Sequence, residues 1–343
     1  MKKILALTLA LCMILSLAAC GAKEETPSAP TASSAASSAA ASQQTETVNK
    51  DDYFITVLTG PTSGIYFPIG GAFATALGNY GYATSSTATG ASAENINAIL
   101  TGQGELAVAM SDSVLQAYEG TGAYEGVEPA SNLKMLMSLW PNYVQLVTTA
   151  DSGIKTFEDL KGKRVGVGAP NSGVELNARM IFEAHGMTYD DCKVDYLSYG
   201  EAISQMQNGL CDAAFVTSGL GNATILELGV NKEIYIVPIE GQALQNLIDK
   251  YPCYSEGVIP KDTYDTESDT TTATVMNIML VNDELPDAVV YDLMNGINQE
   301  VATIQSSHNT AAANIIPENY LRATPIPLHP GAEQWYKHNG FLN

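Results

Sequence analysis

Loops rich in glycine, serine, threonine and asparagine recur along this chain, and their residue types are those that bind small anions. Hydroxyl groups, carboxamides and the backbone amides that glycine leaves accessible donate hydrogen bonds without carrying a charge. The residues that we expect to line a ligand site are Thr59, Gly60, Gly64, Tyr66, Ser92, Asn95, Ser111, Asn171, Ser172, Thr217 and Ser218. The chemistry they predict is binding of a small anionic or zwitterionic solute, with no catalytic step.

Each of these loops follows a short apolar run and precedes a helical pattern. Phe54–Leu58 is typical of a buried strand, and the loop at 59–64 follows it before a helix that begins near Tyr66. Further helices begin near Ser92, which fits an N-cap, and near Val174. Helix N-termini carry unpaired N–H groups and a partial positive charge. Three of them directed at one cleft would bind a carboxylate without an arginine.

Several of these side chains also fit a structural role. Tyr66 fits a core aromatic residue, and Asn95 fits a capping residue in the first turn of its helix. Asp112 fits a structural cap and a partner for a ligand amino group equally well. Arg179 fits a surface salt bridge better than a ligand contact. The loops themselves also fit ordinary connections in an α/β protein.

Strand and helix patterns alternate through the rest of the chain, which is typical of α/β proteins with mainly parallel sheets. The pattern restarts near Phe157, which indicates two successive α/β lobes. Runs at 133–139 and 144–148 are expected to be two strands separated by Trp140-Pro141-Asn142. Ligands bind beyond the carboxyl ends of the strands in open α/β sheets, so two lobes facing each other would enclose a ligand.

The start of the chain predicts export and a lipid anchor. Two lysines precede an apolar run at 4–19, which is shorter than the about 20 residues of a membrane span and is typical of a signal peptide at 1–19. Leu17-Ala18-Ala19-Cys20 resembles a bacterial lipobox, in which Cys20 receives the lipid. Residues 20–51 are expected to form the lipidated cysteine and a flexible tether, since they have little apolar surface to bury.

Composition excludes several classes of function. The chain has 16 Lys and Arg against 37 Asp and Glu, a net charge of −21, which disfavours nucleic-acid binding and adhesion to anionic lipid. Cys192, Cys211 and Cys253 lie in the folded part without metal-site or disulfide-framework spacing, although one bridge between two of them stays open. We therefore expect no metal and no cofactor.

Several segments resemble one family of transport receptors. Thr59-Gly60-Pro61-Thr62-Ser63-Gly64-Ile65-Tyr66-Phe67-Pro68-Ile69-Gly70 and the segment His329-Pro330-Gly331-Ala332 are the most specific, and Ala91-Ser92-Ala93-Glu94-Asn95 agrees. These segments are similar to the TAXI subfamily of solute receptors for TRAP-type (tripartite ATP-independent periplasmic) transporters, over nearly all of 53–340. The chain departs from the family pattern at Met110, where glutamine is usual, and at 171–174 and 219–222.

The resemblance implies a type II periplasmic-binding-protein fold, with two α/β lobes joined by crossing strands around a cleft. It places lobe I at 52–145 plus 275–343 and lobe II at 146–274. It also implies hinge closure on a small carboxylate, such as glutamate, glutamine or a dicarboxylate, and delivery to TRAP membrane subunits. We expect a monomeric, extracytoplasmic lipoprotein anchored to the cell membrane.

A secreted enzyme and an adhesin-type interaction module are the alternatives to a receptor. A secreted enzyme is disfavoured because the chain has no Gly-x-Ser-x-Gly elbow, Walker loop or complete dinucleotide loop. An adhesin-type interaction module would have no cleft for a small ligand, so ligands would not raise its thermal stability.

Overall fold

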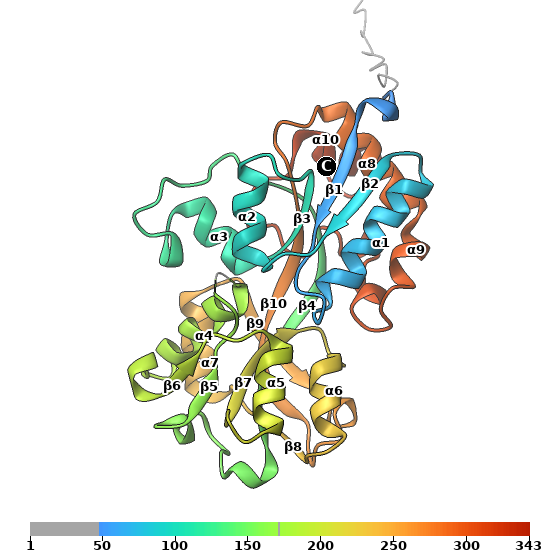
Figure 1. Cartoon of the computed structure of the whole chain (residues 1–343). Coiled ribbons are helices and arrows are strands. Elements are labelled where there is room, and N and C mark those ends of the chain that lie inside the picture. The colour runs from blue at the N-terminus through green and yellow to red at the C-terminus, as the bar shows by residue number, and fades with distance from the viewer. Residues whose placement is uncertain (1–47, 171) are drawn as a thin grey trace, which may run out of the picture. The chain divides into compact units, whose positions relative to one another are not determined.

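The computed structural model describes residues 48–170 and 172–343, which all belong to one compact unit. The predicted signal peptide, Cys20 and nearly all of the tether therefore lie outside the described residues, as does Asn171. The described strands form a ten-stranded sheet with the order β2-β1-β3-β10-β4-β7-β5-β6, in which β8 also pairs with β4 and β9 with β10 (Figure 1).

One half of the molecule, here called lobe I, is built on the parallel strands β1–β3. Its strands and helices are β1 (Phe54–Leu58), α1 (Tyr66–Asn79), β2 (Ala83–Thr87), α2 (Ser92–Leu100), β3 (Leu106–Met110), α3 (Ser111–Glu119), α8 (Asp287–Gln299), α9 (Val301–Gln305) and α10 (Pro330–His338). Along β3, Val108 packs in the core that contains α1 and α8, while Ala107 and Ala109 pack in the core that contains α2 and α3. Burial of both faces explains why β3 is continuously apolar.

The other half, lobe II, repeats this architecture on β5–β7. Its strands and helices are β5 (Arg164–Gly166), α4 (Gly173–Ala184), β6 (Lys193–Asp195), α5 (Tyr199–Gln207), β7 (Ala213–Ser218), α6 (Ala223–Gly229), β8 (Ile234–Val237), α7 (Gly241–Lys250) and β9 (Tyr254–Ile259).

Short 3₁₀ helices occur in both lobes. They lie at Lys50–Asp52, Gly122–Tyr124, Ala150–Ser152, Phe157–Leu160, Tyr189–Asp191, Lys261–Thr263, Ala312–Asn314 and Pro317–Asn319.

Two long antiparallel strands, β4 (Lys134–Thr149) and β10 (Thr270–Val281), run from one lobe into the other (Figure 1). In lobe I, β10 pairs with β3; in lobe II, β4 pairs with β7 and β8, and β10 pairs with β9. The fold is thus the predicted one: two α/β lobes joined by crossing strands, as in type II periplasmic binding proteins. The residue boundaries proposed for the lobes stay a prediction.

The expected break at Trp140-Pro141-Asn142 is wrong, because β4 continues through these residues as one strand. Proline has no N–H to give to a sheet ladder and is tolerated in strands at bulges. The register between β4 and β10 shifts here, between Met276 and Ile278. Asn277 occupies the irregular position, and its side-chain Nδ2 donates to Trp140 O at 2.9 Å. A side chain therefore makes a hydrogen bond where the regular ladder is interrupted.

The segment His329-Pro330-Gly331-Ala332 packs the last helix onto lobe I. His329 is the N-cap of α10: its Nδ1 accepts from Gly331 N at 3.2 Å, and its Nε2 contacts Leu285 O at 3.1 Å. A side chain at position 331 would place its Cβ 2.2 Å from Asp287 O, so only glycine fits against α8. This motif therefore packs α10 against α8, and it is not part of the predicted ligand loops.

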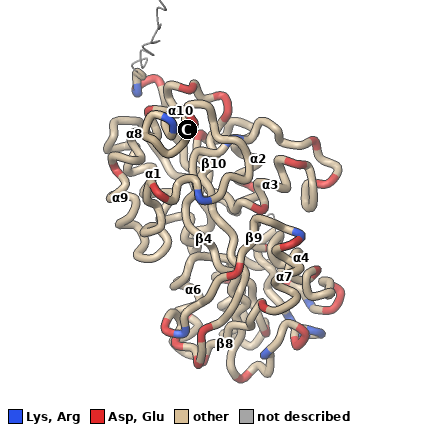
Figure 2. The backbone as a smooth tube through the Cα atoms, turned by 180° about the vertical axis from the view of Figure 1, so that it is seen from behind, with Lys and Arg blue, Asp and Glu red and all other residues tan. Residues whose placement is uncertain are grey.

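Acidic residues outnumber basic ones on both lobes, and the two kinds are interspersed along the backbone (Figure 2). Cys192, Cys211 and Cys253 are free thiols. Within the residues that the structure describes, no helix combines the length and the apolar character needed to cross a membrane.

Candidate ligand-binding site

A cavity of about 40 Å³ lies between the two lobes, beside the crossing strand β4. It is lined by Pro61, Gly64, Ile65, Tyr66, Gly90, Ala91, Met110, Asn142, Ala169, Ser172, Gly173, Val174, Ser198, Tyr199, Thr217 and Ser218. The first seven of these residues come from lobe I, Asn142 comes from the crossing strand β4, and the remainder come from lobe II. The cavity therefore depends on how the two lobes meet.

Three helices present their first residues to this cavity. The helix α1 contributes Tyr66, α4 contributes Gly173 and α5 contributes Tyr199. The caps before α4 and α5 are serines: Ser172 accepts from Glu175 N at 3.3 Å, and Ser198 forms a capping box with Glu201. Each helix start brings free N–H groups and a partial positive charge. The cavity thus has the electrostatics of an anion site.

The carboxyl end of β7 supplies two hydroxyl groups to the same cavity. Ser218 Oγ already accepts a hydrogen bond from Asn222 Nδ2 at 3.1 Å. Thr217 is only 2% exposed, and its Oγ1 has no hydrogen-bond partner within the described structure. Buried hydroxyls are nearly always paired, so the Thr217 hydroxyl is available to form a hydrogen bond with a ligand in the cavity.

The floor of the cavity is a hydrogen-bonded network on the crossing strands. Asn277 Oδ1 accepts from the Tyr66 hydroxyl and from Asn142 Nδ2 at 3.1 Å. Asn142 Oδ1 accepts from Trp140 Nε1 at 3.0 Å. Burial raises the pKa of Tyr66 well above its usual value, so its hydroxyl stays protonated. The Trp140 ring meets the Tyr66 ring edge-on, with centroids 5.7 Å apart.

The structure brings five of the predicted site residues together at the cavity: Gly64, Tyr66, Ser172, Thr217 and Ser218. Thr59, Gly60, Ser92, Asn95 and Ser111 lie nearby but do not line it. Asn171 lies outside the described residues. That these residues contact a ligand stays a prediction, and the geometry favours the five that line the cavity.

The buried polar residues outside the lining make structural hydrogen bonds instead. Asn95 Nδ2 donates to Thr59 O and to Val108 O, both at 2.7 Å, and its Oδ1 accepts from Thr89 at 2.7 Å. Thr59 Oγ1 donates to Thr87 O at 2.8 Å. These contacts join the loops after β1 and β2 to β3. Asn95 therefore has a structural role, but it bridges these loops to β3 and does not cap its own helix as the sequence suggested.

Ser92 is not the N-cap of α2, contrary to expectation. It is the first helical residue, and its Oγ accepts from Met110 N at 3.1 Å. Ser92 also lies close to lobe II: a Cβ on Gly173 would sit 2.8 Å from Ser92 Oγ and 2.3 Å from Met110 Cε. Small residues at 92 and 173 therefore let the lobes meet.

The N-cap of α2 is Ala91, whose φ of 77° and ψ of −143° belong to a region that glycine occupies readily and other residues rarely do. Ala91 lines the cavity, so this strain lies at the candidate site. We expect Ala91→Gly to raise the free energy of unfolding by about 1 kcal/mol, because relief of strain exceeds the entropy that glycine gains in the unfolded chain. Urea denaturation measures this, and a less stable variant would contradict it.

Residue-by-residue sequence reasoning missed Asn142 and Tyr199. Tyr199 follows the Ser198 cap, and its hydroxyl donates to Thr217 O at 2.6 Å. Asn142 is a carboxamide within a buried strand, and Asn277 on β10 is another. An isolated amide in an otherwise apolar run is the signal that would have identified both asparagines, since a buried amide must be paired.

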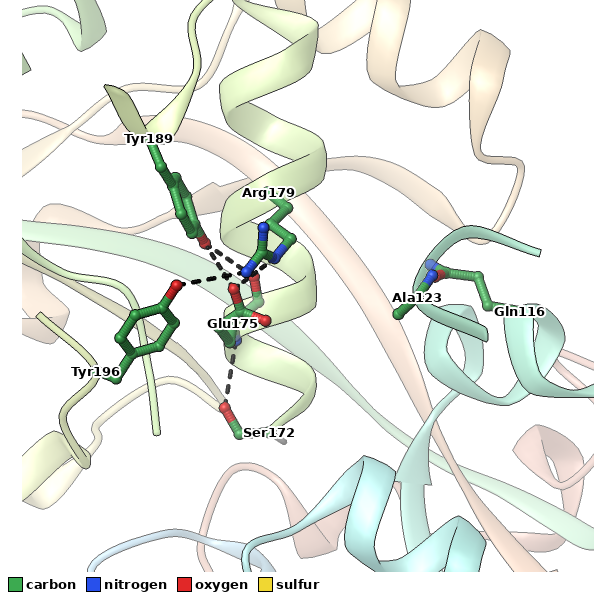
Figure 3. A network of polar contacts seen from close by, with 7 residues as sticks. All are labelled: Gln116, Ala123, Ser172, Glu175, Arg179, Tyr189 and Tyr196. Atoms are coloured by element: carbon green, nitrogen blue, oxygen red, sulfur yellow. Dashed lines mark hydrogen bonds and ion pairs between the residues drawn. The ribbon is translucent and has the colours of Figure 1, made fainter. Parts of the chain in front are cut away.

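Arg179 does not line the cavity. Figure 3 shows its side chain beside Glu175, Tyr189 and Tyr196. Its Nε pairs with Glu175 at 2.6 Å, one turn earlier on α4, and its guanidinium lies 4.7 Å from the centre of the Tyr189 ring. The Arg179 side chain is 54% exposed. This geometry agrees with the salt bridge expected for it.

Asp112 belongs to a second, buried contact between the lobes. Its Oδ2 accepts from Asn177 Nδ2 on α4 at 2.6 Å and from the Tyr254 hydroxyl on β9 at 2.8 Å. Beside it, Gln116 Nε2 contacts Met180 Sδ at 3.3 Å. Burial raises the pKa of Asp112 to about 6. We name Asp112, Asn177 and Tyr254 the interlobe latch, because they tie α3 of lobe I to lobe II.

Solved structures share this fold at low sequence identity. A protein from Bordetella bronchiseptica RB50 is 16% identical, with 83% of this chain and 80% of that chain covered and a TM-score of 0.50. PhnD1 from Prochlorococcus marinus (MIT 9301), solved in complex with methylphosphonate, is 12% identical, with 75% and 90% covered and a TM-score of 0.51. The model of the NMT1-like family matches residues 57–340, which is most of the folded part. The chain therefore belongs to the NMT1-like family.

Proposed function

We propose that this chain is an extracytoplasmic solute receptor that encloses a small carboxylate between its lobes and passes it to a membrane transporter unchanged. The observation that carries the proposal is the cavity between the lobes, where three helix N-termini and the unpaired Thr217 hydroxyl converge. Amides and hydroxyls aimed at one point replace the water around an anion without an arginine.

Binding by hinge closure follows from the two long strands. The strands β4 and β10 are the continuous connections under the cavity, and residues from both lobes form its walls. Small changes along these strands would separate the walls and admit the solute. A ligand that contacts both lobes would then favour the closed arrangement.

The polar groups of the cavity suit binding rather than catalysis. Ser172 and Ser198 cap helices, Ser218 is bonded to Asn222, and Thr217 contacts no base in the described structure. A nucleophile needs such a base within hydrogen-bond reach. These arrangements support a receptor over the alternative of a secreted enzyme.

Anchoring and delivery complete the proposal. The lipobox at Cys20 supports a lipid anchor outside the cytoplasmic membrane, which mass spectrometry of the mature N-terminus would establish. The resemblance of the 59–70 segment to TAXI receptors supports a TRAP transporter as the recipient. The chain would act as a monomer that carries its solute over a short tethered distance.

The proposal is tested by ligand-induced stabilisation and tryptophan fluorescence of the purified chain. A carboxylate at 100 times its dissociation constant is expected to raise the free energy of unfolding by about 2.7 kcal/mol. Closure should also change the emission of Trp140, which contacts Tyr66 and Asn142 under the cavity. Trp335 lies on α10, so the Trp335→Phe variant isolates the Trp140 signal.

Absence of both effects across a panel of small carboxylates would reject the receptor proposal. An adhesin-type module would give that outcome. Turnover of any member of the panel would instead favour the enzyme.

A further inference from the structure

The cavity has no ionisable group of ordinary pKa on its walls. Among the described residues that line it, none is Asp, Glu, Lys, Arg or His. Asn171, which precedes Ser172 and is not described, is also neutral by type. The sequence around these lining residues is uncharged as well, over 59–72, 139–149, 165–170 and 172–174.

The charged side chains beside the cavity are engaged elsewhere. Glu94 accepts from Gly90 N at 2.8 Å, and Glu201 accepts from Ser198 N at 2.9 Å. Glu175 is paired with Arg179. Asp112 Oδ2 is bonded within the interlobe latch, its Oδ1 has no partner in the described structure, and the residue does not line the cavity. None of these groups faces the cavity as a partner for a second ligand charge.

The rest of the lining is apolar and the space is small. Ile65, Met110 and Val174 contribute aliphatic side chains. The cavity has room for roughly three water molecules, which favours a small solute. One carboxylate satisfies the helix N-termini and Thr217. A second charged group on the ligand, an ammonium or a carboxylate, would lose its hydrating water without gaining an oppositely charged partner.

We propose that the solute is a short monocarboxylate with an apolar tail, and that the neutral walls exclude both α-amino acids and dicarboxylates. This inference rests on the proposed receptor function and narrows its ligand class. Ile65, Met110 and Val174 would contact the apolar tail of the solute. The backbone N–H groups at the helix N-termini and the Thr217 hydroxyl would bind its carboxylate. Selectivity then arises from the cost of burying a second charge.

The test compares four-carbon ligands that differ only in charge. Isothermal titration of the purified chain with butyrate, 2-aminobutyrate and succinate at pH 7.5 separates the effect of an added ammonium from that of a second carboxylate. Butyrate is expected to bind at least about 100-fold more tightly than either of the others. Glutamate, included as a fourth ligand, is expected to bind as weakly as 2-aminobutyrate.

A positively charged variant of the cavity wall is expected to shift the selectivity toward succinate. Met110→Lys places a cation at the wall of the cavity, so succinate should bind more tightly to it than to the native chain, and by more than butyrate gains. Met110→Gln is the matched control, since it adds polarity of similar length without charge and should not favour succinate. Thermal unfolding of each variant establishes that it folds, and the ligand comparison on the native chain stands without them.

The possible results of these titrations distinguish a failure of the monocarboxylate inference from a failure of the receptor proposal on which it rests. Equal or tighter binding of succinate, 2-aminobutyrate or glutamate by the native chain would overturn the monocarboxylate inference and leave the receptor proposal standing. Failure of all four to bind, together with no effect in the wider carboxylate panel, would overturn both.

Discussion

The Thr217→Val variant is expected to bind its carboxylate about 10- to 100-fold more weakly, while the ligand-free protein keeps its stability. The Thr217 hydroxyl has no partner in the described structure, so its removal costs the folded protein no hydrogen bond. A hydrogen bond to a charged group contributes about 1.5–3 kcal/mol, which corresponds to that change in affinity. Titration calorimetry measures the dissociation constant, and urea denaturation measures the stability.

Thr148→Val is the matched control for this prediction. Thr148 is also a buried threonine on a strand of lobe II, but its Oγ1 donates to Asp212 O at 2.7 Å. The same substitution there should lower the free energy of unfolding by about 1 kcal/mol and leave ligand affinity unchanged. If Thr217→Val binds ligand normally, or loses as much stability as Thr148→Val, the unpaired hydroxyl is not part of the site.

The contrast between these two threonines illustrates what the sequence alone could not reveal. Thr148 ends an apolar run that predicts a strand and Thr217 directly follows another; in the structure both residues lie within strands, β4 and β7. Thr217 is predicted to line the site because the segment Thr217-Ser218-Gly219 follows an apolar run that ends at Val216. Asn95, in the first turn of a helix, is also a predicted site residue, yet its side chain bonds the loops after β1 and β2 to β3. The local pattern predicts the loop, whereas the tertiary packing decides whether its side chain faces the cavity.

The crossing strands were the least predictable part of the fold. Pro141 indicated a break in β4, because proline interrupts regular strand pairing. The strand continues, and Asn277, distant in sequence, supplies a side-chain hydrogen bond to Trp140 O at the bulge. A contact between residues this far apart in the sequence cannot be predicted from the local residue pattern. The same long-range network forms the floor of the cavity, so the error in the strand concealed Asn142 as a candidate.

Between pH 4 and pH 7 the Asp112 carboxyl is expected to lower the free energy of unfolding by about 3 kcal/mol as the pH rises. Burial raises the pKa of Asp112 from 3.8 in its ordinary state to about 6 in the folded protein. Over this window the folded protein holds the proton more tightly than the unfolded chain, so deprotonation favours unfolding. A difference of about two pH units corresponds to about 3 kcal/mol. Urea denaturation across this pH range measures the slope.

The same proton should link pH to ligand binding, because the latch joins the two lobes. When the lobes part, Asp112 leaves Asn177 and Tyr254 and regains access to water, which returns its pKa toward the ordinary value. The closed form therefore binds the proton more tightly, and a ligand that selects the closed form binds about fourfold more tightly at pH 5.5 than at pH 7.5. Titration calorimetry at the two pH values measures this ratio.

Asp112→Asn isolates the contribution of this one carboxyl. The other ionisable groups of the cluster titrate outside the window, since burial raises the pKa of Cys253 to about 12 and that of Tyr254 well above its usual value. The variant should therefore lose about 3 kcal/mol of the pH-dependent change in stability and most of the pH dependence of affinity. Glu119→Gln, an exposed change on the same helix, should retain both. If Asp112→Asn follows the native pH profile instead, the buried carboxyl does not link closure to protonation.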